Sequence, residues 1–261
     1  MLTIDVGNSD TSIAVYDMDA GSTTSDDGLL EHWRIGTHSD RTTDEFASIM
    51  SSFFDLAELR LSDVRGMIFA SGVPRAKASL RDFADRYLDV TPIAIGPGIK
   101  TGMAIEYDNP PELGADRIVN AVAAYELYGG PAIVVDFGTG TNYDIVSERG
   151  SFMGGAIAPG IEISLDALFD NASALASIEL VEPRSVIGKS TSEALQSGTL
   201  YGYAASVDGM VDRYRQELGE ETVVVATGGL ADVIAPVASR IDHVDGFLTL
   251  HGLRLVYFRN V

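Results

Sequence analysis

The residues of this sequence best suited to chemistry are two aspartates, Asp5 and Asp136, which occupy the same place in two similar stretches. The stretches are LTIDVGNSDTSIAVYD (2–17) and IVVDFGTGTNYDIVSE (133–148). In each, an apolar run ends in the aspartate, and an apolar residue, a glycine and small polar residues lead to a second strand-like run. Each pattern is typical of a β-hairpin. The repetition needs an explanation beyond the hairpin itself.

Phosphate binding is the chemistry that such turns favour. A turn of glycine and small residues exposes backbone N–H groups, and such concave arrangements bind phosphate oxygens. An aspartate just before the turn repels phosphate, but it can bind a cation that bridges to it. Two opposed turns would surround a nucleotide with donors and hold a metal between them, as phosphoryl transfer requires. A single copy of this pattern is more simply explained as a structural hairpin. Two copies make the functional interpretation about as strong as the structural one.

Other phosphate-binding patterns are weak in this chain. The P-loop pattern G-x-x-x-x-G-K-[ST] is absent from the sequence. ATGGLA (226–231) follows an apolar run and is a third turn suited to close backbone approach. By itself it could equally be the connection between a strand and a helix.

The composition excludes several classes of protein. The chain has 261 residues, enough for one large domain or two modest ones. No apolar stretch approaches the roughly 20 residues of a membrane span, and no basic segment precedes an apolar one as in a signal peptide. The absence of cysteine excludes disulfides, thiolate metal sites and cysteine nucleophiles. We therefore expect a cytoplasmic protein.

The formal net charge of −20, with only three lysines, excludes nucleic acid and anionic membranes as partners. The acids are dispersed and not in blocks, which favours a solubility adaptation over an acidic binding surface. Any anionic substrate then depends on donors and cations placed close to it.

The elements that must position the two turns alternate between strands and helices. In the first half we expect a third strand at 31–38, a helix capped near Thr42 or Thr43, a buried strand within 64–74 and a second helix at 76–88. Residues 90–114 are rich in glycine and proline, which predicts an irregular connection that carries ligand contacts.

The second half repeats this order. We expect a helix at 115–130, the second hairpin at 133–147, a glycine-rich turn leading into a helix at 150–173, a long helix at 190–218, a strand, turn and helix at 222–236, and a final helix at 245–260. Strands followed by helices, twice, predict two related α/β halves facing a cleft, with ligands at the strand ends between them.

Seven motifs in order give the chain a resemblance to one family. They are DVGNSDTSIAVYD, KTGMAIEYDNPPELGADRIVNAVAAY, VVDFGTGTNYDIV, GGAIAPGI, GKSTSEALQSG, ATGGLA and LTLHGLRLVY. The chain resembles type III pantothenate kinases, members of the acetate and sugar kinase/Hsp70/actin superfamily. The resemblance implies an α/β protein of two tandem ribonuclease-H-like (actin-like ATPase) domains, which we expect at 1–114 and 115–261. It also implies that the doubled turn is one phosphate loop from each half of a duplicated fold.

The activity implied is ATP-dependent phosphorylation of pantothenate to 4′-phosphopantothenate, the first step of coenzyme A synthesis. The resemblance assigns Asp116 as the general base and Asp136 as the ligand of a monovalent cation, K⁺ or NH₄⁺. It assigns ATP and Mg²⁺ contacts to the first turn, with Asp5 the Mg²⁺ ligand, and a further ATP contact to Thr139. The first-turn residues are Asp5, Val6, Gly7, Asn8, Ser9, Asp10, Thr11 and Ser12. Those for pantothenate are Tyr107, Gly114, Ala115, Asp116, Arg117 and Thr191.

These assignments make chemical sense. Asp116 stands at the start of a predicted helix, where the dipole favours the ionised carboxylate that accepts a hydroxyl proton. From the letters ADR alone, a helix cap followed by a surface arginine is the simpler interpretation. The guanidinium of Arg117 suits the carboxylate of pantothenate. A cation at Asp136 would offset negative charge beside ATP.

Weaker candidates have simpler structural interpretations. Thr191 could cap the helix that follows it, and Tyr107 could pack beside a proline turn. Trp33 is expected in the core. The four histidines show no metal-ligand spacing and are expected to be structural or exposed; they are His32, His38, His243 and His251.

Several residues depart from the family pattern. Ser9 replaces a usual threonine, and Asp10 adds a negative charge where asparagine or a basic residue is common. Gly140 and Asn142 replace alanine and threonine; Gly140 should loosen the second turn, and Asn142 still offers hydrogen bonds. These departures bear on nucleotide affinity more than on activity.

Two alternatives remain open. A kinase for another small hydroxyl substrate would not need the whole DNPPELGADR segment (108–117), and a regulator derived from the enzyme would be expected to lack Asp5 or Asp116. The resemblance also implies a homodimer. The small residues of the predicted long helix at 190–218 could permit close packing of two helices at its interface.

Overall fold

The computed structural model describes residues 1–172 and 175–261, which form two compact units with separate sheets and cores. Unit 1 comprises Met1–Met103, Asp108–Ala123 and Phe247–Val261, and unit 2 comprises Ala104–Tyr107 and Ala124–Gly246. This division differs from the expected boundary at 114/115, because the chain passes between the units several times. The C-terminal helix in particular returns to unit 1.

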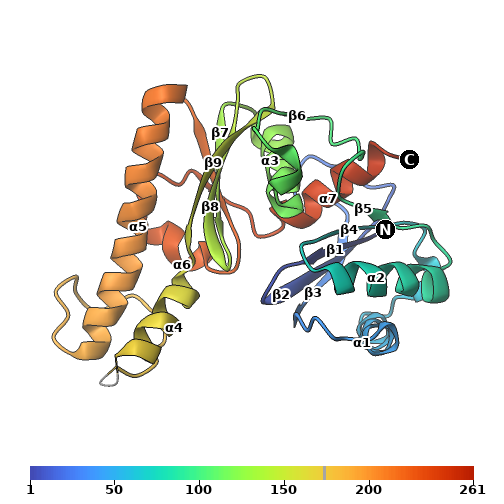
Figure 1. Ribbon diagram of the computed structural model, residues 1–261, viewed down its shortest axis with the longest axis horizontal. Coiled ribbons are helices and arrows are strands. Elements are labelled where there is room, and N and C mark those ends of the chain that lie inside the picture. Colours follow the sequence, from blue (N-terminus) through green and yellow to red (C-terminus); the bar gives the residue numbers. More distant parts are fainter. Residues whose placement is uncertain (173–174) are drawn as a thin grey trace. The chain divides into compact units, whose positions relative to one another are not determined.

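The sheet of unit 1 has the strand order β3-β2-β1-β4-β5 (Figure 1). Strand β1 pairs antiparallel with β2 and parallel with β4, and the β1–β2 hairpin places Asp5 opposite Ser12. The first hairpin and the third strand are therefore confirmed. The strands are β1 (Leu2–Val6), β2 (Asp10–Tyr16), β3 (Leu29–Gly36), β4 (Met67–Ser71) and β5 (Ile93–Ala94).

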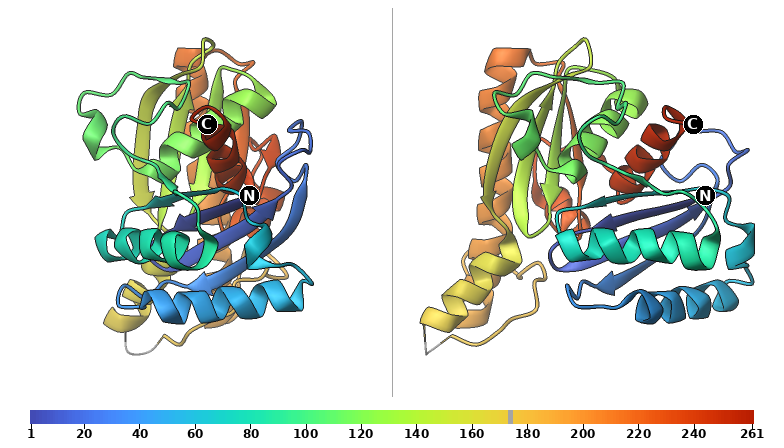
Figure 2. Two further views of the ribbon diagram at one scale, coloured as in Figure 1. Left: turned by 90° about the vertical axis from the view of Figure 1, so that its right-hand side faces the viewer. Right: turned by 45° about the vertical axis from the view of Figure 1, so that its right-hand side comes forward.

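One hydrophobic core of unit 1 lies on the face of this sheet that α1 (Thr43–Leu56) and α2 (Pro74–Phe83) cover. Alternate residues of the strands point to this side, where they pack against α1 and α2, which continues into the π-helix Ala84–Leu88. Figure 2 shows both helices along that face. Trp33 belongs to this layer, stacked on Phe53 with ring centroids 5.2 Å apart, so its expected place in the core is confirmed.

Helix α7 (Leu248–Phe258) covers part of the opposite face and carries a fully buried arginine. Arg254 donates hydrogen bonds to the carbonyls of Asp27, Ala20 and Gly21 at 2.5, 2.8 and 2.9 Å. Its guanidinium also lies 5.1 Å from the ring centroid of Tyr16. These bonds fix the polar connection between β2 and β3 to the C-terminal helix.

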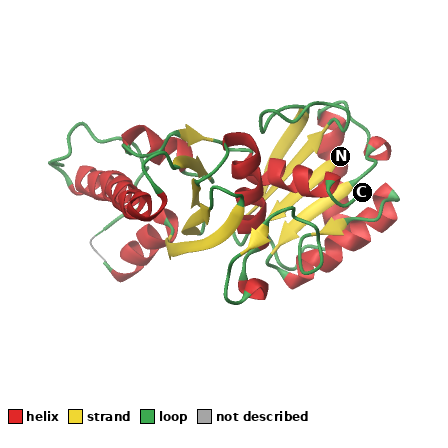
Figure 3. Cartoon of the chain, turned by 90° about the horizontal axis from the view of Figure 1, so that it is seen from above, coloured by secondary structure: helices red, strands yellow, loops and turns green. Residues whose placement is uncertain are grey.

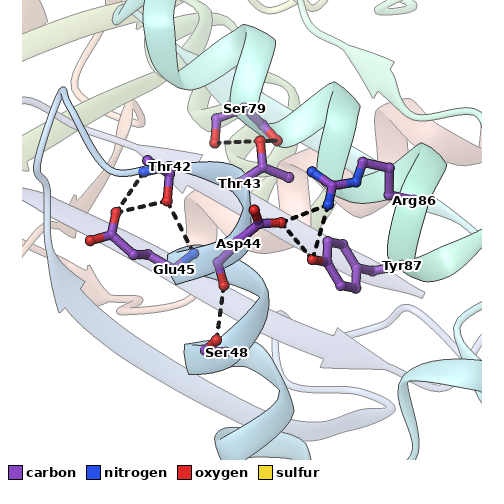
Figure 4. A network of polar contacts seen from close by, with 8 residues as sticks. All are labelled: Thr42, Thr43, Asp44, Glu45, Ser48, Ser79, Arg86 and Tyr87. Atoms are coloured by element: carbon purple, nitrogen blue, oxygen red, sulfur yellow. Dashed lines mark hydrogen bonds and ion pairs between the residues drawn. The ribbon is translucent and has the colours of Figure 1, made fainter.

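The start of α1 is held by a polar network (Figure 4). Thr42 is the N-cap, and its hydroxyl accepts from the Glu45 N–H while the Glu45 carboxylate accepts from the Thr42 N–H at 2.8 Å. This reciprocal capping box confirms the predicted helix start. Asp44 accepts from the Tyr87 hydroxyl at 2.6 Å and pairs with Arg86 at 2.8 Å. The Tyr87 hydrogen bond holds the pKa of Asp44 below its usual value.

The sheet of unit 2 repeats the topology of the first. Its order is β11-β10-β7-β8-β9-β6, with β7 antiparallel to β8 and parallel to β10, as β1 is to β2 and β4. Figure 3 shows the strands of both units in yellow among the red helices. The two-residue β6 adds an edge strand that has no counterpart in unit 1. The strands are β6 (Ala104–Ile105), β7 (Ala132–Phe137), β8 (Gly140–Val146), β9 (Ser151–Pro159), β10 (Val223–Thr227) and β11 (His243–Val244). Two related α/β halves are therefore confirmed.

Strand β9 corrects the prediction of a glycine-rich turn at 150–173. The chain there is extended from Ser151 to Pro159 before α4 (Ile161–Asn171) begins, and the last predicted residue, Ser173, lies outside the described residues. The glycines serve close strand contact, since a Cβ on Gly155 would lie 1.7 Å from the Tyr143 carbonyl oxygen. Gly154 has φ +119° beside a register shift in the β8–β9 pair.

The predicted long helix of unit 2 is present and packs on the sheet. Helix α5 (Thr191–Leu218) contributes Leu200, Ala204, Val207 and Val211 to a core that includes Ile133 and Val135 of β7. Helix α3 (Ala115–Tyr128) crosses from unit 1 to unit 2, and α6 (Ala231–Ile234) is short. Within the described ranges, no helix is long and apolar enough to cross a membrane.

Replacing Thr42 with alanine should lower the free energy of unfolding by about 1 kcal/mol, because the α1 N-terminus loses its side-chain cap. Urea denaturation would measure the loss. Ser48→Ala is the control, since the Ser48 hydroxyl donates to the Asp44 carbonyl within the same helix. Equal stability of the two variants would contradict a stabilising capping box.

Candidate active site

The first acidic turn, between β1 and β2, is braced from the end of β3. The Gly7 N–H donates to the Asp10 carbonyl at 2.9 Å, which closes the turn. The Thr37 N–H donates to the Ser9 carbonyl at 2.7 Å, and the Thr37 hydroxyl lies 2.8 Å from that of buried Thr11. Asn8 and Ser9 at the tip remain exposed. The turn is therefore an ordered and accessible structure.

A row of polar side chains crosses the sheet beside this turn. The strand registers pair Asp5 with Ser12 and Ser12 with Arg34. Residues directly opposite each other share a face of the sheet, and the neighbours Ile4, Val6 and Ile13 face the core, so this row lies on the other face. Arg34 forms an ion pair with Asp10. The Mg²⁺ and ATP contacts that the resemblance assigns to Asp5 and Ser12 are thus neighbours.

The second acidic turn, between β7 and β8, has the same construction. The Gly138 N–H donates to the Gly140 carbonyl at 3.0 Å, and the Gly160 N–H donates to the Thr139 carbonyl at 3.1 Å. Asp136 is opposite Asn142 in the register and half-buried, and Thr139 is exposed. The residue after the third strand therefore pins the turn in both units, through Thr37 in the first and Gly160 in the second.

Two glycines make room for the second turn. The close backbone approach predicted for ATGGLA applies to Gly228, whereas no such role was predicted for Gly160. A Cβ on Gly160 would lie 2.3 Å from the Thr139 carbonyl oxygen and 2.5 Å from that of Gly138. Gly228 has φ +90°, and a Cβ there would lie 2.5 Å from Asp136 Oδ1. The motifs GGAIAPGI and ATGGLA contain these glycines, so their purpose is backbone approach to the turn.

The predicted helix start at Asp116 is confirmed, since α3 begins at Ala115. The Asp116 carboxylate lies over Gly114, where a Cβ would be 2.4 Å from Oδ1 and 3.6 Å from Arg117 Cγ. Asp116 is half-buried and Arg117 is buried. Gly114, Asp116 and Arg117 are thus one packed group in unit 1, and the burial of Arg117 corrects its interpretation as a surface arginine.

Tyr107 and Thr191 belong to unit 2. The Tyr107 ring packs edge-on against Phe152 with centroids 6.1 Å apart, beside Gly154. Thr191 is the exposed first residue of α5, and Ser190 is the N-cap that accepts from the Glu193 N–H at 3.2 Å. The capping interpretation of Thr191 is therefore wrong. The Glu193 carboxylate accepts hydrogen bonds from the Lys189 N–H and from Arg184 beside this helix start. These bonds hold the pKa of Glu193 below its usual value.

Asp5 and Asp136 are suited to cations that take some of their ligands from a bound substrate. In the described part of the chain, no group of three or more acids and histidines gathers as a metal site. Mg²⁺ commonly uses one or two carboxylates together with substrate phosphates. Asp5, beside a turn rich in hydrogen-bond donors, can provide such a carboxylate. Asp136, with its carboxylate against the Gly228 backbone position, suits a weakly held cation with oxygen ligands.

The histidines behave as expected. His32, His38 and His243 are exposed, and His251 is buried in α7 with its ring 3.3 Å from the Ser22 hydroxyl.

Gly140 starts strand β8, where a Cβ would be 3.3 Å from the Ala158 carbonyl oxygen, so the glycine relieves a close contact with β9.

Known proteins resemble this chain over its whole length. A protein of Halalkalibacterium halodurans named type III pantothenate kinase is 49% identical over 261 residues, covering 100% of both chains. One of an Exiguobacterium species with the same name is 50% identical over 260 residues, covering 100% of this chain and 99% of the relative.

Solved structures share the fold at low sequence identity. Component A of (R)-2-hydroxyglutaryl-CoA dehydratase from Acidaminococcus fermentans superposes with a TM-score of 0.58 at 14% identity, covering 98% of this chain and 96% of that one. The ethanolamine utilization protein EutJ from Carboxydothermus hydrogenoformans gives 0.54 at 14% identity, covering 98% and 89%. These likenesses identify the actin-like ATPase fold.

The sequence profile of the family described as type III pantothenate kinase matches residues 1–213. With both acidic turns, the Gly114–Arg117 group and full-length relatives at about half identity, this chain belongs to the type III pantothenate kinase family.

Proposed function

We propose that this protein transfers the γ-phosphoryl group of ATP to the 4′-hydroxyl of pantothenate and so begins coenzyme A synthesis. The observation that carries the proposal is the full-length identity of 49% to a protein named type III pantothenate kinase. The two braced turns and the ordered start of α3 support it, because they supply the donors and the carboxylate that the reaction needs.

The first step is binding of the ATP phosphates. The exposed tips at Asn8–Ser9 and Thr139 present backbone N–H groups and hydroxyls that can donate to phosphate oxygens. Since phosphoryl transfer depends mainly on positioning and neutralisation of charge, rigid turns are the main contribution of these residues. The hydrogen bonds from Thr37 and Gly160 supply that rigidity.

Asp116 then acts as the general base. Its ionised carboxylate, in the first turn of α3, orients the pantothenate hydroxyl and accepts its proton. The hydroxyl oxygen forms a bond to the γ-phosphorus, the bond from that phosphorus to the β,γ-bridging oxygen breaks, and ADP leaves. Arg117 binds the pantothenate carboxylate, and Tyr107 and Thr191 complete the pantothenate contacts.

Two cations accompany the reaction. Asp5 holds the Mg²⁺ that enters with ATP, and Asp136 holds K⁺ or NH₄⁺. When bound, they offset the negative charge of the phosphates and the two aspartates, which a chain of net charge −20 does little to offset by itself. A cytoplasmic location stays a prediction.

We further propose a homodimer formed through α5. Gly198, Gly202, Ala205 and Gly209 are exposed on this helix, and in the described part of the protomer an added Cβ at each glycine meets no atom within 4 Å. Such positions leave room for the backbone of a second helix at short distance. The interface would bring substrate contacts such as Thr191 close to the partner subunit.

Replacing Asp116 with asparagine should lower kcat by about 10²–10⁴-fold, because the amide cannot accept the hydroxyl proton. ADP release with ATP, Mg²⁺ and pantothenate, in potassium and in sodium buffer, measures the loss and the cation requirement. Asp82→Asn, on the exposed surface of α2, is the matched control and should keep full activity. Folded protein without pantothenate-dependent turnover in either salt would overturn the proposed function in favour of another hydroxyl substrate or a regulatory role.

Gly160→Ala should raise KM for ATP at least several-fold and lower the free energy of unfolding by about 1–3 kcal/mol, because its Cβ forces the second turn to move. Gly246→Ala is the control, since an added Cβ there meets no atom within 4 Å among the described residues. Steady-state kinetics and thermal unfolding measure both effects. Unchanged KM in a destabilised Gly160 variant would separate the second turn from nucleotide binding.

Gly202→Leu should convert the dimer into a monomer, because the protomer accommodates the side chain whereas a second α5 cannot approach it. Sedimentation velocity measures the change. Glu220→Leu adds the same side chain at an exposed position beyond α5 and should leave the dimer intact. A fully active wild-type monomer would refute the interface.

A further inference from the structure

We propose that Arg34 is a positioning residue for the nucleotide phosphates, acting through Asp10 of the first turn. The inference rests on the proposed function, since it concerns how that turn binds ATP. Arg34 lies in β3, whereas the turn joins β1 to β2, so the two meet only through the sheet. The role is to hold the Asp10 carboxylate and offset its charge.

Arg34 completes the row that runs from Asp5 through Ser12, on the face of the sheet opposite the core. Asp10 is two residues before Ser12 on the same strand and therefore shares that face. The ion pair runs along this face, beside the residues assigned to ATP and Mg²⁺.

Asp10 accompanies Asp5 at a turn whose function requires it to approach the several negative charges of ATP. An uncompensated carboxylate at this distance would repel the phosphates. The ion pair with Arg34 makes the contribution of position 10 close to neutral, which is what an asparagine there would provide without a partner.

The ion pair contributes little to folding. The side chains of Arg34 and Asp10 are 56% and 36% exposed, and ion pairs in such surroundings contribute little to stability. The end of β3 is already fixed by the Thr37–Ser9 hydrogen bond and by the Arg41 guanidinium, which donates to the Gly36 carbonyl at 3.0 Å. The effect of Arg34 should therefore appear in ligand binding and not in folding.

A double-mutant cycle tests the inference. The variants are Arg34→Gln, Asp10→Asn and the two combined, and calorimetric titration with MgATP gives the dissociation constant of each without pantothenate. We expect Arg34→Gln to weaken binding about three- to tenfold, and Asp10→Asn, which removes the carboxylate from the turn, not to weaken it. The double variant should match Asp10→Asn, because the proposed effect of Arg34 on binding is exerted through the Asp10 carboxylate.

The expected coupling should also shrink in 1 M salt, where the Debye length is about 3 Å. Arg60→Gln, Asp63→Asn and their combination repeat the same charge changes at an exposed pair outside the sheet and should leave binding unchanged. Thermal unfolding midpoints should be alike throughout.

Three outcomes would overturn the role. Arg34→Gln could leave MgATP binding unchanged; it could weaken binding equally with and without the Asp10→Asn change, which indicates direct phosphate contact; or it could act only by lowering the unfolding midpoint. The titration needs no phosphorylation of pantothenate. Its result is therefore distinguishable from failure of the proposed function, which the ADP-release assay reports.

Discussion

One hydrogen bond, formed twice, governs the arrangement of this protein's two acidic turns. In each unit the residue that follows the third strand donates its N–H to a carbonyl at the tip of the turn: Thr37 to Ser9, and Gly160 to Thr139. This hydrogen bond fixes the turn to the end of the third strand and leaves the tip of the turn exposed. The first turn adds a bond between the hydroxyls of Thr11 and Thr37, whereas the second depends on glycines that let neighbouring backbone come close. The two acidic turns thus share one backbone hydrogen bond, which different residues support in each unit.

The hairpins and helix α1 could be predicted because their signals are local. An aspartate before a glycine turn and the Thr42–Glu45 capping box lie within a few residues of what they determine. Strand β9 could not be recognised as easily, because Gly154 and Gly155 normally indicate a turn, and only the contact with the Tyr143 carbonyl shows why glycine is needed. The division into units is not a single boundary such as 114/115, since α7 joins unit 1 through Arg254 and the distant loop 17–28.

The candidate site shows the same contrast between local and distant information. Asp116 and Gly114 could be named from one short motif, and the packing of that carboxylate over the glycine follows from their adjacency. Arg34, Gly160 and Gly228 act on turns that are remote in sequence, so only the strand register or the close backbone approach reveals them. Resemblance to a family identifies residues that contact substrates more readily than residues that support those contacts.

The strongly acidic composition makes these supporting residues important for the binding of anions. In a chain of net charge −20, the long-range field disfavours ATP and pantothenate alike, and the approach of each anion must be offset locally. Backbone N–H groups do this without adding a side-chain charge, which is why rigid turns suit the phosphates. Where the chain places an extra carboxylate at such a turn, as at Asp10, a neighbouring strand supplies the guanidinium of Arg34. An acidic surface and an anion site are compatible only when the compensation is built at the scale of single side chains.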